Sequence, residues 1–290
     1  MFLGVEMENN LVFEVKNLAC AYKSSISNVL EIDDLLIEKG SLVFIIGPSG
    51  VGKSTILETL GLMNNTVKSK SSTVLDLILE DGNKIDLLNI WDSKNSYISS
   101  LRNEFYSFIF QSNNLFNSLT AFQNVLSSSL IQGQDIKFKA KEAESILNEL
   151  LSDLNIDSRD DIDITTMSGG QRQRISFARA ILADFKILFA DEPTGNLDWY
   201  NAKKLMNFLK KKIPSHGAGI IVSHDIDLSL EFADKIVLID KKNKKVNGED
   251  FSYGIISLEN TFVKENNSWT NGKIKLDNSN FLSFIKEKFI

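Results

Sequence analysis

The chain has 290 residues, of which 43% are hydrophobic and 24% are charged, close to the usage of an ordinary soluble globular protein. Its formal net charge of −6 argues against a general nucleic-acid binder, and its only cysteine, Cys20, excludes an internal disulfide and a cysteine-based zinc cluster. No apolar run approaches the ~20 residues of a membrane span, and residues 1–10 do not read as a secretory signal. We therefore expect any membrane association to run through another protein.

The first part of the chain is predicted to be rich in β-structure. Three strands are expected, at 11–16, 29–32 and 42–46. The third is an unbroken apolar run, which is typical of a strand buried on both faces. A glycine-rich loop and a helix at 54–62 should follow it, and then a hairpin formed by 73–79 and 84–88.

The remaining chain alternates in pattern. Residues 92–163 look mainly helical, and the apolar residues of 140–154 recur near the helical period of 3.6. Further helices are predicted at 168–182 and 201–212, and further strands at 187–190, 220–222 and 236–239. Strands that alternate with helices predict an α/β fold with a largely parallel sheet. The last residues break the alternation and predict a hairpin, 261–265 with 273–276, and then a helix at 280–289.

Positions 47–54 read GPSGVGKS and match a phosphate-binding loop between a buried strand and a helix. Glycines let backbone amides face a phosphate, and the helix start adds a positive dipole end. Lys53 should reach the β- and γ-phosphates, and the Ser54 hydroxyl should ligate magnesium. A chance glycine-rich turn would need all these positions to match by accident, so we predict ATP or GTP binding. The predicted contacts are Gly47, Ser49, Gly50, Val51, Gly52, Lys53, Ser54 and Thr55.

Two acidic residues, Asp191 and Glu192, follow the apolar run of 187–190. Two acids at a strand end, taken alone, usually form a solvated turn. Beside a phosphate loop, the catalytic interpretation is favoured. Asp191 is predicted to hold magnesium and Glu192 to polarise the attacking water as general base.

Positions 167–174 read MSGGQRQR and resemble the signature motif of ABC ATPases, with Met167 where leucine is commoner. Ser168 would cap a helix whose glycines expose amides to an anion. The resemblance implies that this segment binds the γ-phosphate of ATP held by the opposite subunit, so the active unit would be a dimer. The residues assigned to that contact are Ser168, Gly169, Gly170 and Gln171.

Other positions are similar to the same family in the same order along the chain. Tyr22 resembles the aromatic residue that stacks on adenine, although a lone tyrosine near a strand end more often packs in a core. Gln111 resembles the glutamine that touches magnesium and the attacking water, and His224 resembles the histidine that contacts the γ-phosphate. Asn196 to Asp198 resembles the loop that crosses the dimer interface.

The resemblance implies a P-loop nucleoside triphosphatase core with a mostly parallel sheet, an antiparallel β subdomain and a helical signature subdomain. We expect this cassette to span residues 11–245, with the helical subdomain at about 92–166 and a C-terminal appendage at 246–290. The segments around 110–121 and 191–198 look most like the branch for lipoprotein release and macrolide export.

The expected activity is ATP hydrolysis with ATP and Mg2+, which would power export, lipoprotein release or mechanical coupling through an integral membrane permease. The resemblance further implies a homodimer in the cytoplasm, peripheral on the inner face of the membrane, with no nucleic acid and no span of its own. Two alternatives stay open: a soluble ABC-type ATPase without transport, and an ATP-gated regulatory module. Soluble members of the family carry coiled-coil arms or zinc modules, or join two cassettes in one chain.

Overall fold

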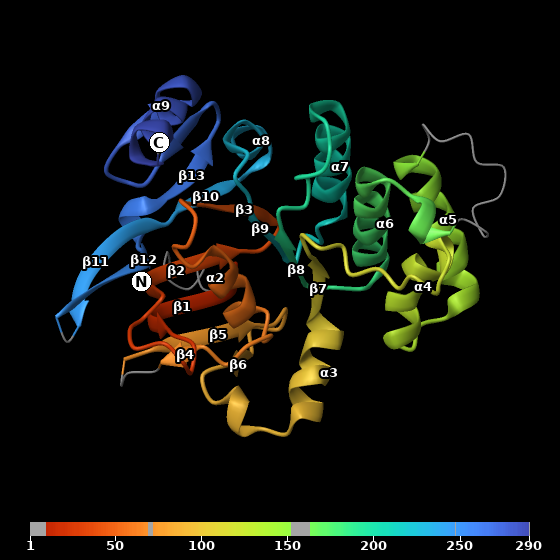
Figure 1. Cartoon of the computed structure of the whole chain (residues 1–290), viewed down its shortest axis with the longest axis horizontal. Coiled ribbons are helices and arrows are strands. Elements are labelled where there is room, and N and C mark those ends of the chain that lie inside the picture. The colour runs from red at the N-terminus through yellow and green to blue at the C-terminus, as the bar shows by residue number, and fades with distance from the viewer. Residues whose placement is uncertain (1–9, 69–71, 152–162, 247, 290) are drawn as a thin grey trace.

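The computed structural model describes residues 10–68, 72–151, 163–246 and 248–289 (Figure 1). Eight strands form one sheet in the order β15-β14-β13-β10-β3-β9-β8-β7. Its parallel strands are β3 (Ser41–Ile46), β7 (Tyr106–Ile109), β8 (Ile187–Asp191), β9 (Ala218–Val222) and β10 (Lys235–Leu238). Nearly all of their side chains are buried, as expected for strands covered on both faces. The parallel α/β core predicted from the alternating pattern is confirmed.

A second sheet has the order β11-β12-β2-β1-β5-β6, with β4 paired to β1. Its strands are β1 (Leu11–Cys20), β2 (Leu30–Glu38), β4 (Val67–Lys68), β5 (Val74–Ile78), β6 (Lys84–Asp86), β11 (Asp240–Val246) and β12 (Glu249–Ile256). All neighbours are antiparallel except β12 and β2. One face of this sheet packs with β3, β8 and β9 in a shared apolar core that includes Phe13, Ile45 and Phe189.

The helices lie around the two sheets (Figure 1). They are α2 (Lys53–Leu60), α3 (Asn95–Phe105), α4 (Ala121–Ile131), α5 (Ile136–Leu150), α6 (Gly169–Leu182), α7 (Trp199–Lys212), α8 (Ile226–Phe232) and α9 (Asn278–Phe289), with 3-10 turns η1 (Ile90–Asp92), η2 (Ile164–Thr166) and η3 (Leu258–Asn260). Helices α4, α5 and α6 pack together on one side. Ala143, Ile146 and Leu147 of α5 are buried there, as the helical period predicted. None of the helices in the described residues has the length and apolar character needed to cross a bilayer.

Several parts of the fold differ from the sequence-based expectation, and β11, β12 and α8 were not predicted. Tyr106–Ile109, inside the segment expected to be helical, is strand β7 and pairs with β8. Strand β13 (Thr261–Glu265) pairs with β14 (Ser268–Thr270) and not with 273–276, so the expected hairpin is wrong. The turn is tighter because Asn266 adopts a left-handed conformation with φ of 55°. Part of the expected second strand lies in β15 (Lys275–Asp277), which pairs with β14.

Residues after 246 add strands to both sheets. β12 pairs with β2, and β13 pairs with β10. Helix α9 then packs Phe281 on Phe262 and Trp269, with ring centroids 4.7 and 5.3 Å apart. All three rings are fully buried in the core that also holds α8. The division of the chain at residue 245 stays a prediction.

Candidate nucleotide site

A cavity of about 480 Å3 lies at the carboxyl ends of the parallel strands, where β3 and β8 deliver their following loops to the same edge of the sheet. It brings together residues from five separated segments of the sequence. Those predicted are Ser49, Gly50, Gly52, Lys53, Ser54, Thr55, Gln111, Asp191, Glu192 and His224. Val29, Gly195 and Val222 also line it and were not predicted.

The phosphate loop leaves the start of α2 open to an anion. Gly50 and Gly52 have φ angles of 77° and 95°, which few residues other than glycine adopt without strain. Gly52 is the N-cap of α2 and provides no side-chain hydrogen bond to the helix. The first amides of α2 are therefore not satisfied by a side-chain cap, which is the arrangement that favours phosphate binding.

Lys53 is buried at the base of this loop. Its Nζ donates to the carbonyl oxygens of Gly47 at 2.7 Å and Pro48 at 2.8 Å. Burial lowers the pKa of this ammonium, and the carboxylates of Glu192 and Asp191 oppose that shift. A phosphate would supply further negative charge to a cation that is already partly desolvated.

The acidic pair faces Lys53 across the cavity. Burial raises the pKa of Asp191, while Lys53 and a hydrogen bond with the Ser54 side chain oppose the shift. Burial also raises the pKa of Glu192, and the His224 backbone N–H, which donates to its Oε2 at 3.3 Å, opposes that shift. Two partly desolvated carboxyl groups beside the Lys53 ammonium can bind a metal ion or accept a proton.

Glu192 is held in an unusual backbone conformation. Its φ is 48°, and its amide donates to the carbonyl of Val222 at 3.0 Å. Among the residues that the structure describes, none donates a hydrogen bond to its buried Oε1, which lies 3.4 Å from His224 Nε2. A buried carboxylate oxygen without a donor suits a water molecule, so the geometry fits a general base. Burial and the nearby Lys53 charge lower the pKa of His224, and the Asp191 carboxylate opposes that shift.

The oxygens of Ser54, Gln111 and Asp191 line the same cavity and have the hard-ligand character that Mg2+ prefers. Within the described residues, no three side chains of the His, Cys, Asp and Glu types gather as a metal cage. These residues therefore fit a magnesium ion that takes its other ligands from the phosphates and water, as is usual for nucleotide hydrolases.

Three residues predicted to contact the nucleotide of their own copy do not line the cavity. The Tyr22 hydroxyl donates to Glu58 Oε2 at 2.8 Å and lies 3.2 Å from Thr55 Oγ1, so this half-buried side chain is fixed against α2. The Gly47 carbonyl accepts from Lys53, and the Val51 side chain is buried in the core. Their contacts with nucleotide stay predictions.

The signature residues lie outside the cavity, at the exposed start of α6. Ser168 Oγ accepts from the Gln171 amide at 3.3 Å, and Gln171 Oε1 accepts from the Ser168 amide at 2.7 Å. These two bonds form a capping box. A Cβ on Gly170 would lie 3.2 Å from the Asn196 carbonyl oxygen, a tight contact, so glycine favours close approach to the next loop. Gly169 faces open space.

One further residue, Gln173, connects the signature helix to the loop that follows β8, and it was not predicted from the sequence. Gln173 of α6 is buried, its Nε2 donates to the Glu192 carbonyl at 3.1 Å, and its Oε1 accepts from the Asn196 amide at 3.0 Å. It thereby fixes the turn that carries Glu192. The only signal for it in the sequence is its position inside the signature motif.

The model of the family described as "ABC transporter" matches residues 30–195, in the region that forms this cavity. The chain belongs to the ABC transporter family. It is 35% identical over 220 residues to the macrolide export ATP-binding/permease protein MacB of Neisseria meningitidis, which covers 75% of this chain and 32% of that protein. It is 33% identical over 226 residues to the lipoprotein-releasing system ATP-binding protein LolD of Wigglesworthia glossinidia brevipalpis, covering 77% and 92%.

A solved ABC cassette has the same fold. This dimeric ATP-binding cassette, in a post-hydrolysis state with ADP and Pi, is 26% identical with a TM-score of 0.61, and the match covers 78% of this chain and 93% of that chain. The ABC cassette described here spans about a third of the MacB relatives and most of LolD. The predicted cassette fold and membership of the ATP-binding, ATP-hydrolysing ABC family are confirmed.

Proposed function

We propose that this cassette works as a homodimer that hydrolyses ATP on the cytoplasmic face of a membrane and powers an integral membrane permease. The observation that carries the proposal is the division of the motifs. The phosphate loop, Asp191, Glu192 and His224 line one cavity, whereas Ser168 lies outside it on an exposed helix start. A complete site therefore requires a second copy to supply the signature residues.

In the closed dimer, each ATP lies between the phosphate loop of one copy and Ser168, Gly169, Gly170 and Gln171 of the other. Lys53 neutralises the β- and γ-phosphates, and Glu192 polarises the attacking water. His224 contacts the γ-phosphate. A magnesium ion held by Ser54 and Asp191, with Gln111 beside it, would supply charge neutralisation on the phosphates. Dimer closure excludes other water and strengthens these electrostatic interactions.

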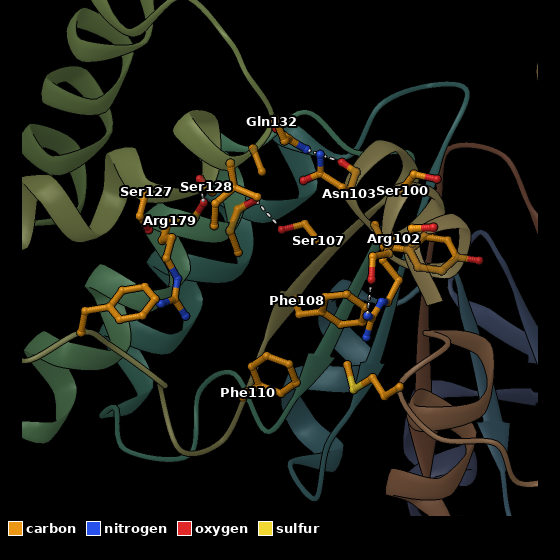
Figure 2. Close-up of a pocket in the computed structure, with 18 residues that line it drawn as sticks. Ser100, Arg102, Asn103, Ser107, Phe108, Phe110, Ser127, Ser128, Gln132 and Arg179 are labelled. Atoms are coloured by element: carbon orange, nitrogen blue, oxygen red, sulfur yellow. Dashed lines mark hydrogen bonds between the residues drawn. The ribbon is translucent and has the colours of Figure 1, made fainter. Parts of the chain in front are cut away.

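The permease is proposed to bind a groove of about 690 Å3 between α3, β7, α4 and α6 (Figure 2). Phe108 and Phe110 lie in its centre, and Arg102 and Arg179 lie on opposite walls. Its lining contains no acidic residue, so the charge favours a permease segment that carries a carboxylate. We propose that this segment is a short helix, and that Asn113, Leu115 and Phe116 border its binding site.

The relatives connect the cassette with two kinds of membrane process, macrolide export and lipoprotein release. We propose that this chain serves a system of that branch, with the cargo selected by the permease. Within the described residues the longest helix, α5, has 15 residues, so no coiled-coil arm of the kind found in soluble ABC ATPases is present there.

The experiment that tests this function is affinity purification of the protein from detergent-solubilised native membranes, followed by mass spectrometry and an ATPase assay of the eluate. We expect a protein with several membrane spans to accompany the cassette and the eluate to hydrolyse ATP. Recovery from the soluble fraction alone, with no membrane protein attached, would contradict the transport role.

A further inference from the structure

The side chain of Arg179 connects the signature helix to the loop that carries Gln111. Arg179 lies near the C-terminal end of α6, the helix that begins at the signature motif. Its Nη1 donates to the carbonyl of Asn114 at 2.6 Å, and its Nη2 donates to the carbonyl of Asn113 at 3.0 Å. The planar fork of the guanidinium thus holds two consecutive carbonyls, a geometry that the single point charge of a lysine does not reproduce.

The charge of Arg179 is not neutralised by another side chain within the described residues. Burial lowers the pKa of Arg179, and no carboxylate of the described residues forms an ion pair with it. The lining of the adjacent groove contains no acidic residue either. The two bonds to backbone carbonyls therefore hold this half-buried guanidinium against one conformation of the loop.

The conformation that Arg179 holds is a strained one. Asn113 and Asn114 both have positive φ angles, 61° and 47°. Their amides close tight turns onto the carbonyls of Phe110 at 3.0 Å and Ser112 at 2.7 Å. Two successive non-glycine residues in the left-handed region cost free energy and persist only where their surroundings fix them. These turns begin at the residues on either side of Gln111, so they fix the backbone from which Gln111 reaches the cavity.

The same loop is in contact with the acidic strand. Phe110 stacks on Phe108 with centroids 5.7 Å apart, and Phe108 stacks on Phe189 at 5.4 Å. Phe189 lies in β8 two residues before Asp191. Phe108, Phe110 and Arg179 all line the groove, as Figure 2 shows. The fork of Arg179 is therefore the link between groove, signature helix and Gln111.

We propose that Arg179 is a positioning residue for ATP hydrolysis, which holds the Asn113–Asn114 backbone so that Gln111 and the signature helix keep a fixed relation. The effect of Arg179 on kcat rests on the proposed ATPase function, whereas its effect on the loop backbone does not. A segment that enters the groove and displaces the fork from these carbonyls would release Gln111, which gives the groove a direct connection to the catalytic cavity.

The test compares Arg179→Ala, Arg179→Lys and a control, Lys139→Ala. Lys139 is also a buried cation that holds α6, since its Nζ donates to the Leu182 carbonyl at 3.1 Å, but it makes no contact with the Gln111 loop. The first readout is hydrogen exchange at the Asn113 and Asn114 amides, which does not require hydrolysis. The second is the division of any ATPase loss between kcat and KM, with thermal melting as the measure of folding.

We expect Arg179→Ala to accelerate exchange at Asn113 and Asn114 and to lower kcat by roughly 10- to 100-fold with little change in KM, as for a misplaced catalytic group. Arg179→Lys should show smaller changes in exchange and in kcat than Arg179→Ala. If Arg179→Ala does not fold, Arg179→Lys takes its place in the test. Lys139→Ala should lower the melting temperature and leave kcat and the two amides unchanged.

Unaltered exchange at both amides in Arg179→Ala would overturn the proposal, and so would an equal kcat loss in Lys139→Ala. A wild-type protein without ATPase activity would instead refute the proposed function, while the exchange measurement would still decide whether Arg179 holds the loop.

Discussion

The two helices that begin with glycine-rich motifs, α2 and α6, are built differently at their first turns. Helix α2 starts at Gly52 with no side-chain cap, and its first turn lines the cavity with Lys53, Ser54 and Thr55. Helix α6 starts at Ser168, which forms a closed capping box with Gln171 and faces outward.

The difference teaches how a single fold can serve both halves of a shared site. The first turn of α2 has no side-chain cap and leaves its amides open to an anion, so we expect it to carry most of the binding energy of ATP. The first turn of α6 is complete without a ligand, so it can stay folded in an isolated copy and present Ser168 to the next copy. The predictions below compare changes in the cavity that α2 lines, which we call the α2 side, with changes at the first turn of α6, which we call the α6 side.

The largest effect is expected on the α2 side, from Glu192→Gln. Loss of the general base should lower the rate of hydrolysis by about 10²–10⁴-fold, because the amide cannot accept the proton. ATP binding should be retained, since the phosphate loop is untouched. Steady-state hydrolysis and equilibrium binding of ATP measure the two quantities, and an unchanged turnover would remove Glu192 from this role.

The pH dependence of hydrolysis provides the control for that variant. Burial raises the pKa of Glu192 above its ordinary value of 4.5, and only the ionised form can act as base. Wild-type activity should therefore be present above this raised pKa and lost as the pH falls through it. The residual activity of Glu192→Gln should not show this fall at low pH. If both proteins lose the same fraction of their activity on acidification, the group that titrates is not Glu192.

An intermediate effect is expected from Lys53→Ala. Removing a charge-assisted bond to the phosphates should weaken ATP binding by about 1.5–3 kcal/mol, or roughly 10- to 100-fold. Titration of the isolated protein with ATP measures this loss. If Ser168→Ala loses as much affinity, the expectation that α2 and not α6 binds the ATP of the same copy is wrong.

The smallest effect is expected on the α6 side, from Ser168→Ala. Loss of the cap should lower the free energy of unfolding by about 1 kcal/mol, and ATP affinity of the isolated copy should not change. Hydrolysis should fall by roughly tenfold, because a hydroxyl donor to the ATP of the other copy is lost. Ser168→Thr keeps the hydroxyl and is the matched control. If it loses as much activity as Ser168→Ala, the hydroxyl is not the group that acts.

Much of this site could be predicted because its chemistry is local in sequence. Residues of a phosphate loop, or of Asp191 and Glu192 after a buried strand, are adjacent along the chain, and the parallel sheet brings both to one edge. The contacts that join distant segments could not be predicted in this way. Gln173, whose side chain bonds Glu192 and Asn196, and Arg179, whose fork bonds Asn113 and Asn114, depend on packing between α6 and the core.

The fold was predicted least well where elements are short. Strand β7 has four residues, too few to show a period, and its identity comes from pairing with β8. The C-terminal hairpin was wrong because its register depends on a turn at Asn266 and on pairing with β10, which lies far away in sequence.

The placement of β13 against β10 also protects the molecule from unwanted self-association. Strand β10 is entirely buried, and after Lys235 it is apolar, so an open edge of that kind would be a template for aggregation. The added strands move the edge of the sheet to β15, which has three residues, two of them exposed and charged, Lys275 and Asp277. Lys275 also pairs with Glu265 at 2.7 Å. A buried edge strand is thereby covered, and the sheet ends instead in a short, solvated strand that offers little surface for edge-to-edge pairing.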